Sequence, residues 1–417
     1  MPCLTPIFDD PGKEAVHQEI LFPNELQPLT EGSSALHAKK ILILITEDWF
    51  AVSHFLPLIE TLVATNSEVV VATRCSGRAK EIESLGAKVI PFDFRRSSLN
   101  PLEQVGTIRK LGKLITSQEP DVIHVIAMQP MVLASMAARL TVRKPFMMHL
   151  TGLGFLGISS GAAARLIRPA AMAALNGILS RPNSWLIAEN PDDHKFLVDN
   201  GVAVGDRVTI VPGAGIDEND FPPYKPRVGT PLTAAFVGRM IRSKGVEVLV
   251  DAARLVKEHG QDLAISLYGR SDVDNPEAIP EQQLRAWQAE GLVTWHGHVS
   301  DVAGIWKASD ICVLPSTSRE GMPRSVLEAA ASQRPLIVTD VPGSRHFVRD
   351  GVEGLVVSPN NAKALADALV RLIQDTDLRI AMGDAARARL VAGFTVKHVK
   401  NGILDAYAGL DASVDQQ

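Results

Sequence analysis

Cysteine is scarce in this sequence of 417 residues, and Cys3, Cys75 and Cys312 show no spacing typical of a metal site. They indicate the reduced thiols of a cytosolic protein rather than a disulfide framework. Neither sign of charge is in large excess, because the net charge is −5, so no general attraction to nucleic acid or to an anionic membrane is expected. The sequence also lacks an uncharged apolar run of about eighteen residues, and its first residues lack a basic segment followed by an apolar core. It therefore predicts neither a membrane span nor a signal peptide.

Apolar residues are plentiful, since 46% of the chain is hydrophobic and 21% is charged. This balance is typical of a globular protein, and the length suits two domains of ordinary size. Residues 1–37 are rich in proline and acidic side chains and show no periodicity, which predicts a disordered or loosely packed extension. From residue 38 onward, apolar runs alternate with segments of helical periodicity, as in α/β proteins with parallel sheets.

Two series of strands and helices are expected, one on each side of a proline-rich break at residues 222–226. We therefore expect two doubly wound, Rossmann-like α/β domains that face a cleft. Their predicted bounds are 38–221 and 231–395, with a linker at 222–230 and a final helix and tail at 396–417 that could cross back to the first domain. The expected strands are 39–45, 68–72, 88–91, 122–126 and 146–150 in the first series, and 232–237, 264–268, 293–296, 311–314, 336–339 and 354–357 in the second. The expected helices include 55–65, 77–85, 102–119, 132–140 and 362–374.

Glu320 and Glu328 lie eight residues apart across the predicted start of a helix at Pro323. The mouth of a helix offers unpaired backbone N–H groups and a positive dipole end, which suit a phosphate. At ~1.5 Å of rise per residue, the two carboxylates are on the order of 10 Å apart, too far to act on one bond as an acid/base pair. They suit the two hydroxyl-bearing ends of one long ligand with a phosphate between them, and a sugar nucleotide is such a ligand.

A second motif places Arg239 and Lys244 in a loop that is bounded by Gly238 and Gly245. The loop follows a predicted buried strand and precedes a helix, and cations at the carboxyl end of a parallel strand can grip a diphosphate. Arg242 shares the loop and is assigned no role. An exposed basic loop is the ordinary interpretation of such residues, and the glycines and the strand-end position favour the binding role.

The two motifs, in this order, resemble those of the family-4 retaining glycosyltransferases, and the resemblance covers nearly the whole chain after residue 38. Segments 188–193, 211–217 and 341–344 carry further family-like signatures. Segments 46–54 and 151–154 are most similar to bacterial enzymes that add sugars to lipid-linked or surface-polysaccharide precursors, as in lipopolysaccharide, exopolysaccharide or capsule biosynthesis. The resemblance implies the glycosyltransferase-B architecture and a nucleotide-sugar donor, with uridine as the usual base of the family.

The resemblance also implies roles for residues around the donor. Glu328 is expected to bind the ribose, and Glu320 is expected to contact the transferred sugar near its reacting carbon, where a carboxylate could also stabilise oxocarbenium-like charge. The candidate diphosphate ligands are Arg239, Lys244 and the amides of Gly321 and Met322, and those for the nucleoside are Gly297, His298 and Arg270. For the last three residues an ordinary strand-to-loop turn is an open alternative. No cofactor and no metal ion are expected to be needed for the leaving diphosphate, and no Asp-x-Asp motif is assigned to it.

The first domain is expected to bind the acceptor. Many relatives have histidine directly before the glycine where this chain has Thr151, and His149 could serve in its place as a catalytic group or be a structural strand-end histidine. The other candidate acceptor ligands are Thr151, Gly152, and Trp49 and His54 of an expected loop at 47–50 and its continuation. The aromatic side chains of that loop could stack on a sugar or prenyl chain, or simply cap the core.

The predicted function is transfer of a hexose or N-acetylhexosamine from a nucleotide sugar to a lipid-linked or polysaccharide-precursor acceptor, with retention of configuration. The expected location is the cytoplasm, and residues 153–179 could form a helix that rests on a membrane surface or one that is buried between domains. A nucleotide-sugar epimerase or hydrolase of the same fold and a non-catalytic scaffold of polysaccharide assembly stay open as alternatives. A Rossmann dehydrogenase is disfavoured, because no Gly-x-Gly-x-x-Gly follows the first strand.

Overall fold

The structure is a computed structural model that describes residues 39–94, 101–141, 144–153, 162–227, 231–272 and 275–415. All described residues belong to one compact unit, and the predicted extension 1–37 lies outside the described residues.

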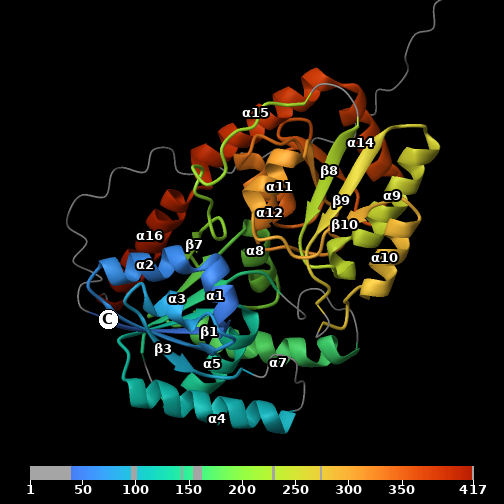
Figure 1. Cartoon of the computed structure of the whole chain (residues 1–417). Coiled ribbons are helices and arrows are strands. Elements are labelled where there is room, and N and C mark those ends of the chain that lie inside the picture. Colours follow the sequence, from blue (N-terminus) through green and yellow to red (C-terminus); the bar gives the residue numbers. More distant parts are fainter. Residues whose placement is uncertain are drawn as a thin grey trace, which may run out of the picture. The chain divides into compact units, whose positions relative to one another are not determined.

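The first half of this unit contains a seven-stranded sheet in which all neighbouring strands are parallel (Figure 1). The strand order is β3-β2-β1-β4-β5-β6-β7, so the chain moves outward from β1 in one direction and then returns to add strands in the other. This reversal beside β1 is the point at which doubly wound sheets bind ligands at their carboxyl edge. The strands are β1 (Lys40–Glu47), β2 (Glu68–Arg74), β3 (Lys88–Pro91), β4 (Val122–Ile126), β5 (Phe146–Leu150), β6 (Ser184–Ala188) and β7 (Val208–Ile210).

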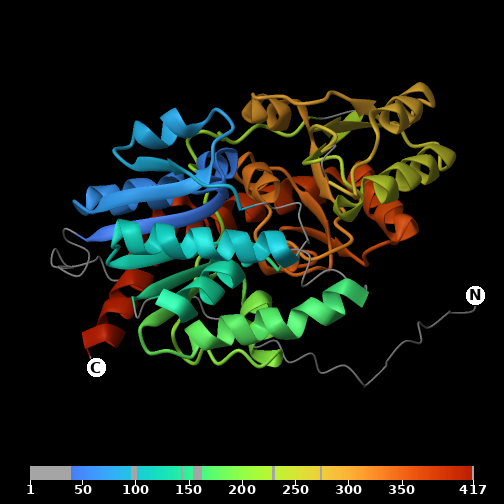
Figure 2. The same ribbon diagram turned by 90° about the horizontal axis from the view of Figure 1, so that it is seen from below.

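Both faces of the first sheet are buried, as the apolar run of β1 predicts. Leu42 and Leu44 face one core with α4, α5 and α7, whereas Ile41, Ile43 and Ile45 face another with α1 and α2. Figure 2 shows α4 in teal and α7 in green across one face of this half. The helices are α1 (Asp48–His54), α2 (Leu56–Ala64), α3 (Ala79–Glu83), α4 (Pro101–Gln118), α5 (Met128–Thr141), α7 (Ala162–Leu179) and α8 (Pro191–Asp199).

The second half contains a six-stranded parallel sheet with the order β10-β9-β8-β11-β12-β13 and one continuous core. Its strands are β8 (Leu232–Val237), β9 (Leu263–Tyr268), β10 (Thr294–Trp295), β11 (Ile311–Leu314), β12 (Leu336–Thr339) and β13 (Gly354–Val357). Its helices are α9 (Val246–Glu258), α10 (Glu281–Ala289), α11 (Val302–Ala308), α12 (Arg324–Ala331), α13 (Ser344–Phe347), α14 (Ala362–Gln374) and α15 (Thr376–Gly393), and the short 3₁₀ helix η2 (Arg242–Lys244) lies in the loop after β8.

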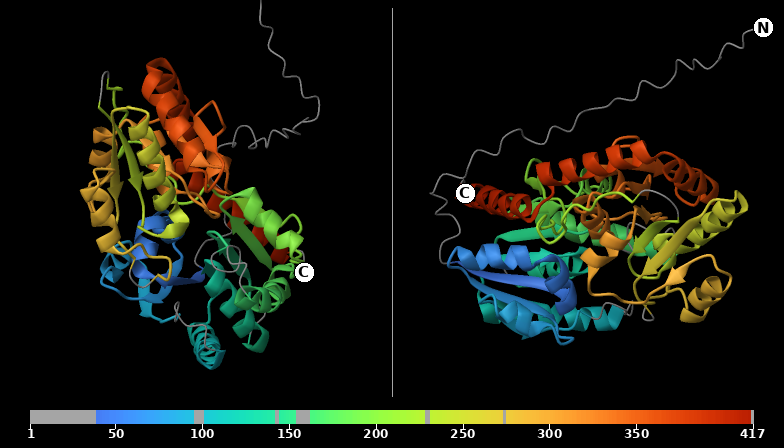
Figure 3. Two further views of the ribbon diagram at one scale, coloured as in Figure 1. Left: turned by 90° about the vertical axis from the view of Figure 1, so that its right-hand side faces the viewer. Right: turned by 45° about the horizontal axis from the view of Figure 1, so that its top comes forward.

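The last helix, α16 (Val396–Asp415), packs on the first half rather than on the second (Figure 3). It contacts α2, β6 and β7, and Tyr407 is fully buried in the core that contains Ile41. The chain passes from the first half to the second after β7 and returns between α15 and α16. These two connections are hydrogen-bonded to each other through a β-bridge between Ile216 and Thr395.

The expectation of two doubly wound parallel sheets is confirmed. The expected loop at 47–50 is wrong, because β1 runs to Glu47 and α1 begins at once with Asp48. The Asp48 carboxylate accepts hydrogen bonds from the N–H groups of Ser76 and Arg78, at 2.7 and 2.8 Å, which fixes the start of the helix against the turn after β2. The expected helix at 55–65 is confirmed as α2, and Phe55 separates it from α1, which was not expected.

Candidate functional site

Three loops of the second half meet at the carboxyl edge of its sheet, after β8, β9 and β10. The N–H of Gly238 donates to Tyr268 O, that of Met240 to Arg270 O, and that of Gly269 to Gly297 O. Glycine is required at 269, because a Cβ there would lie 1.8 Å from Gly238 O. Two of the predicted nucleoside ligands, Arg270 and Gly297, therefore adjoin the loop of Arg239, and His298 follows Gly297 as an exposed side chain.

Lys244 and Glu320, predicted from separate motifs, form one ion pair. The Lys244 ammonium lies 2.8 Å from both carboxylate oxygens of Glu320, and the Ser316 hydroxyl donates to Oε1 at 2.5 Å. The two charged side chains are 20% and 14% exposed, so water screens the pair only in part. A cation and a carboxylate are thereby held together at the mouth of α12.

Arg239 is more exposed and pairs with Asp272 at 2.7 Å. Asp272 is the first residue of an Asp-x-Asp triplet, Asp272-Val273-Asp274, and Asp375-Thr376-Asp377 is a second one. Both triplets were overlooked when no Asp-x-Asp motif was assigned to the diphosphate. Val273 and Asp274 lie outside the described residues, and Asp375 caps α15 by accepting from Leu378 N. Within the described residues, no group of three or more histidine, cysteine or carboxylate side chains could hold a metal ion.

Glu328 lies inside α12 and is buried, in an ion pair with Arg324 one turn before it. Burial raises the pKa of the Glu328 carboxyl, and the charge of Arg324 and its hydrogen bond of 2.7 Å oppose that shift. The Arg324 guanidinium also donates to Ser53 O, which lies in α1 of the first half. No role was predicted for Arg324, although it stands in the glutamate motif at the i, i+4 spacing from Glu328 that brings helical side chains together.

His54 stands beside the cations of the second half. The pKa of its imidazole is lowered to about 3, chiefly by burial and also by the charges of Arg324, Lys244 and Arg239. Its Nδ1 lies 2.6 Å from the Ser53 hydroxyl. His54, predicted on the acceptor side, is therefore a neutral imidazole close to the predicted diphosphate ligands. Trp49 lies on the same helix and is 38% exposed.

His149 is deeper in the first half and is 1% exposed. Its ring packs edge-on against Phe55, and its Nδ1 lies 3.4 Å from Nε2 of His124, whose Nδ1 lies 2.8 Å from the Tyr407 hydroxyl. Burial lowers the pKa of His149 to about 3, and its Nε2 has no hydrogen-bond partner. The burial of His149 and its packing against Phe55 and His124 favour the structural interpretation over the catalytic one.

The loop after β5 contacts the glutamate motif directly. A Cβ on Gly152 would lie 3.5 Å from Gly321 N, and one on Gly321 would lie 2.6 Å from Thr151 O. The predicted acceptor ligands Thr151 and Gly152 and the predicted donor ligand Gly321 are thus neighbours. Gly154, part of the same expected loop, lies outside the described residues.

The turn between β6 and α8 is a further part of this region to which the sequence analysis gave no role, although segment 188–193 was noted as family-like. Glu189 Oε2 accepts from Met322 N at 2.8 Å, and Asn190 Nδ2 donates to Gly321 O at 3.0 Å. Arg319 donates to Asp193 Oδ1 at 3.0 Å, and Arg345 donates to Asp192 Oδ1 at 2.7 Å. The predicted diphosphate ligand Met322 N–H is therefore engaged by a carboxyl group of the first half.

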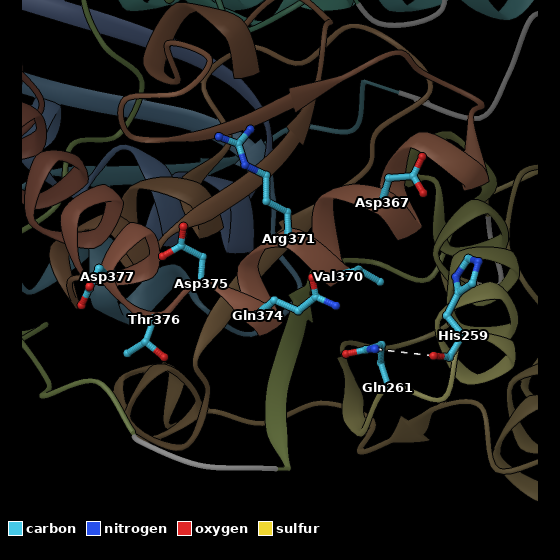
Figure 4. Close-up of a pocket in the computed structure, with 9 residues that line it drawn as sticks. All are labelled: His259, Gln261, Asp367, Val370, Arg371, Gln374, Asp375, Thr376 and Asp377. Atoms are coloured by element: carbon cyan, nitrogen blue, oxygen red, sulfur yellow. Dashed lines mark hydrogen bonds between the residues drawn. The ribbon is translucent and has the colours of Figure 1, made fainter. Parts of the chain in front are cut away.

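A surface hollow of about 910 Å³ lies elsewhere, near the end of α9 and the junction of α14 with α15. Its labelled side chains point in different directions, and a bond between Gln261 and His259 O is the interaction drawn among them (Figure 4). None of its lining residues belongs to the predicted site, so we assign it no function. It is lined by His259, Gln261, Asp367, Val370, Arg371, Gln374, Asp375, Thr376 and Asp377.

Two family models match the chain, one in each half. Residues 231–375 match "Glycosyl transferases group 1", and residues 40–180 match "Glycosyl transferase 4-like". The chain belongs to the group 1 and 4-like glycosyltransferases. It is an enzyme of this class, and the spacing of its two motifs is the feature that indicated this from the sequence.

Two curated glycosyltransferases match this chain over most of their own length. An N,N'-diacetylbacillosaminyl-diphospho-undecaprenol α-1,3-N-acetylgalactosaminyltransferase of Campylobacter jejuni is 26% identical over 79% of this chain and 88% of its own. A UDP-Gal:α-D-GlcNAc-diphosphoundecaprenol α-1,3-galactosyltransferase of Escherichia coli is 24% identical over 78% of this chain and 84% of its own.

Solved structures show the same fold. Anabaena HepE in complex with UDP and glucose superposes with a TM-score of 0.69 at 19% identity, covering 88% of this chain and 98% of that one. Sucrose-phosphate synthase of Thermosynechococcus elongatus has a TM-score of 0.69 at 20% identity, covering 87% and 96%. The glycosyltransferase has the glycosyltransferase-B fold. Among its described residues, no helix combines the length and apolar character needed to cross a bilayer.

Proposed function

We propose that this glycosyltransferase moves a hexose or N-acetylhexosamine from a UDP-sugar to a lipid-linked or polysaccharide-precursor acceptor, with retention of configuration. The names of the Campylobacter and Escherichia relatives, which act on diphospho-undecaprenol sugars, support the acceptor class. The complexes of HepE with UDP and UDP-glucose support the donor class. The observation that carries the proposal is the Lys244–Glu320 pair, with Arg239 and Arg324 close by at the mouth of α12.

On the donor side, Lys244 and Arg239 bind the diphosphate together with the N–H of Gly321. A diphosphate competes with Glu320 for the Lys244 ammonium, and the released carboxylate can then accept hydrogen bonds from sugar hydroxyls. Charge that builds on the leaving group is stabilised by these cations and by the N-terminal end of α12. Glu328 binds the ribose, for which Arg324 must share its carboxylate, and Gly297, His298 and Arg270 surround the base.

On the acceptor side, Trp49, His54, Thr151 and Gly152 line the approach to the transferred sugar. His54 is uncharged next to three cations, and a bound diphosphate would offset those charges and raise the pKa of the imidazole. Retention is consistent with a leaving-phosphate oxygen that takes the acceptor proton on the same face. We place the enzyme in the cytoplasm, with α7 as the candidate for peripheral contact with the membrane that holds the acceptor.

Saturation-transfer NMR with a panel of UDP-, GDP- and dTDP-sugars tests the donor assignment. We expect selective saturation of a UDP-sugar by the wild-type protein and a strong loss of signal with Lys244→Ala. The matched control is Lys363→Ala, which removes an exposed lysine that is likewise paired with a carboxylate, Asp367, at 2.7 Å. Equal signals from the wild type and Lys244→Ala would refute the role of Lys244, and no binding of any UDP-sugar would refute the donor class.

A further inference from the structure

The peptide between Gly321 and Met322 is held on both sides by two consecutive residues of the first half. Glu189 Oε2 accepts from Met322 N at 2.8 Å, and Asn190 Nδ2 donates to Gly321 O at 3.0 Å. Glu189 is 5% exposed and Asn190 is fully buried, so water does not compete for either bond. Both bonds reach main-chain atoms, and they therefore fix the backbone of the loop whatever side chain stands at position 322.

The side chain of Asn190 is held in one orientation by its hydrogen bonds. Its Oδ1 accepts from Asp193 N at 2.9 Å, as the N-cap of α8, and its Nδ2 donates to Asp193 Oδ2 at 3.1 Å as well as to Gly321 O. An amide group has two hydrogens to donate, and both are used here. The orientation of the Asn190 side chain is thus set by the first turn of α8.

The other neighbour of Glu320 is tied to the same turn. Arg319 donates to Asp193 Oδ1 and to Asp192 O, each at 3.0 Å, and Asp193 is fully buried. Glu320 therefore stands between two anchored residues, Arg319 and Gly321. The backbone on both sides of Glu320 is thus tied to the start of α8, and Lys244 and Ser316 hold its carboxylate.

The glutamate motif and the first half approach so closely at Gly321 that no side chain fits at this position. A Cβ on Gly321 would lie 2.1 Å from Glu189 Oε2 and 2.6 Å from Thr151 O. At Gly321 the main chain of the glutamate motif therefore packs directly against the Glu189 carboxyl group and the main chain of Thr151.

We propose that Glu189 and Asn190 are positioning residues, which hold the Glu320 loop in the geometry for sugar transfer from the opposite half of the enzyme. This inference rests on the proposed function, since Glu320 acts on the transferred sugar there. Neither residue needs to touch a substrate. Their effect is on where Glu320 and the Gly321 amide stand when the sugar is transferred.

Glu189 performs this role as a carboxylic acid rather than as a carboxylate. Its pKa is raised to about 8, chiefly by burial and also by the charges of Asp193 on α8 and Glu320 on the facing loop, while the bond from Met322 N opposes the shift. Arg319, the nearby cation of that loop, is engaged by Asp193. Glutamine is therefore the matched replacement, because it keeps an oxygen that can accept from Met322 N and cannot ionise.

The test compares Glu189→Ala, Asn190→Ala and Glu189→Gln in the full-length enzyme, with Asn361→Ala as the control. Asn361 also caps a helix, by accepting from Ala364 N at 3.0 Å, but does not contact the loop. A displacement of about 1 Å can cost on the order of 100-fold in rate. We expect the two alanine variants of the positioning pair to lose about 10- to 100-fold in kcat while UDP binds within about threefold of wild type. Asn361→Ala should keep wild-type kcat.

Glu189→Gln should keep kcat within about threefold of wild type, because the glutamine oxygen can still accept from Met322 N. Hydrogen exchange at the Met322 amide gives a readout that needs no substrate, and both alanine variants should accelerate it. Unchanged exchange or unchanged kcat in both would overturn the inference. If the wild type bound no nucleotide sugar, the proposed function would fall, and exchange at Met322 would still report whether the tie exists.

Discussion

Glu320→Gln should tighten the binding of UDP while it slows sugar transfer. Lys244 lies 2.8 Å from both Glu320 oxygens, and the two charged side chains are 20% and 14% exposed. Exposed ion pairs contribute about 0.2–1 kcal/mol, and charge-assisted hydrogen bonds about 1.5–3 kcal/mol, so a partly buried pair is worth about 1–1.5 kcal/mol. A diphosphate that takes Lys244 must offset this amount, and the glutamine variant removes the competing charge.

The expected gain in UDP affinity is therefore about five- to tenfold, because 1.4 kcal/mol corresponds to a factor of ten. Transfer should fall by about 100-fold or more, since the variant lacks the charge that stabilises the reacting sugar. Isothermal titration with UDP and a coupled assay of UDP release measure the two effects. Glu247→Gln is the control, because it breaks the exposed pair with Arg242 next to the same loop.

The opposite outcome would refute this account of the pair. If Glu320→Gln weakened UDP binding as much as Lys244→Ala does, Glu320 would contribute to the diphosphate site instead of competing with it. If transfer survived at the wild-type rate, the role of Glu320 at the sugar would be wrong as well.

Four further predictions follow from the site and its surroundings. The pKa of His149 is about 3 in the fold against 6.5 in the unfolded chain, so the free energy of unfolding should fall as pH drops below 6.5. His149→Gln should make this pH dependence shallower in unfolding experiments and should retain transfer. In denaturant titration, Asp193→Ala should lower the free energy of unfolding by about 2–3 kcal/mol, because it removes the carboxylate that pairs with Arg319. The control Asp199→Ala, at the exposed end of α8, should lower it by less than about 1 kcal/mol. Trp49→Ala should leave the melting temperature unchanged and raise the acceptor KM several-fold, and an unchanged KM would remove Trp49 from the acceptor site. Transfer should persist in EDTA, and a loss that Mn²⁺ or Mg²⁺ restores would contradict the proposal that cations of the chain alone neutralise the leaving group.

Strand positions in the second half follow from the sequence because they depend on local patterns. The runs 232–237, 311–314, 336–339 and 354–357 are continuous, apolar and bounded by polar or turn residues, and each is a strand with those bounds. Such runs predict strands buried on both faces without any knowledge of their neighbours.

The start of α1 could not be predicted in the same way. The residue before it, Glu47, is not a typical N-cap, and its side chain makes no capping hydrogen bond. The helix is fixed by Asp48, which bonds to the turn at Ser76. That contact joins residues far apart in the sequence, so no local pattern indicates it.

The role of Glu189 also depends on a contact between residues that are far apart in the sequence. A glutamate at the end of a strand ordinarily indicates a solvated carboxylate, and here it is buried against Met322, more than a hundred residues away in the chain. Its protonation state depends on burial and on the charges of Asp193 and Glu320. The sequence indicated the family-like segment, but the physical role of its residues appears only once the two halves are in contact.

The position of α16 has a consequence for synthesis on the ribosome. The core beneath β1 includes Ile403, Ala406 and Tyr407 of α16, and Lys39, directly before that strand, pairs with Asp411 at 2.5 Å. The strands of the first sheet therefore cannot complete their own core until α16 has been translated, although domains generally fold as they emerge. The core of the second half, which contains no residue of α16, can close earlier. Until α16 emerges, the nascent enzyme would thus expose an apolar face of its first sheet, and that face is where a chaperone would be expected to bind.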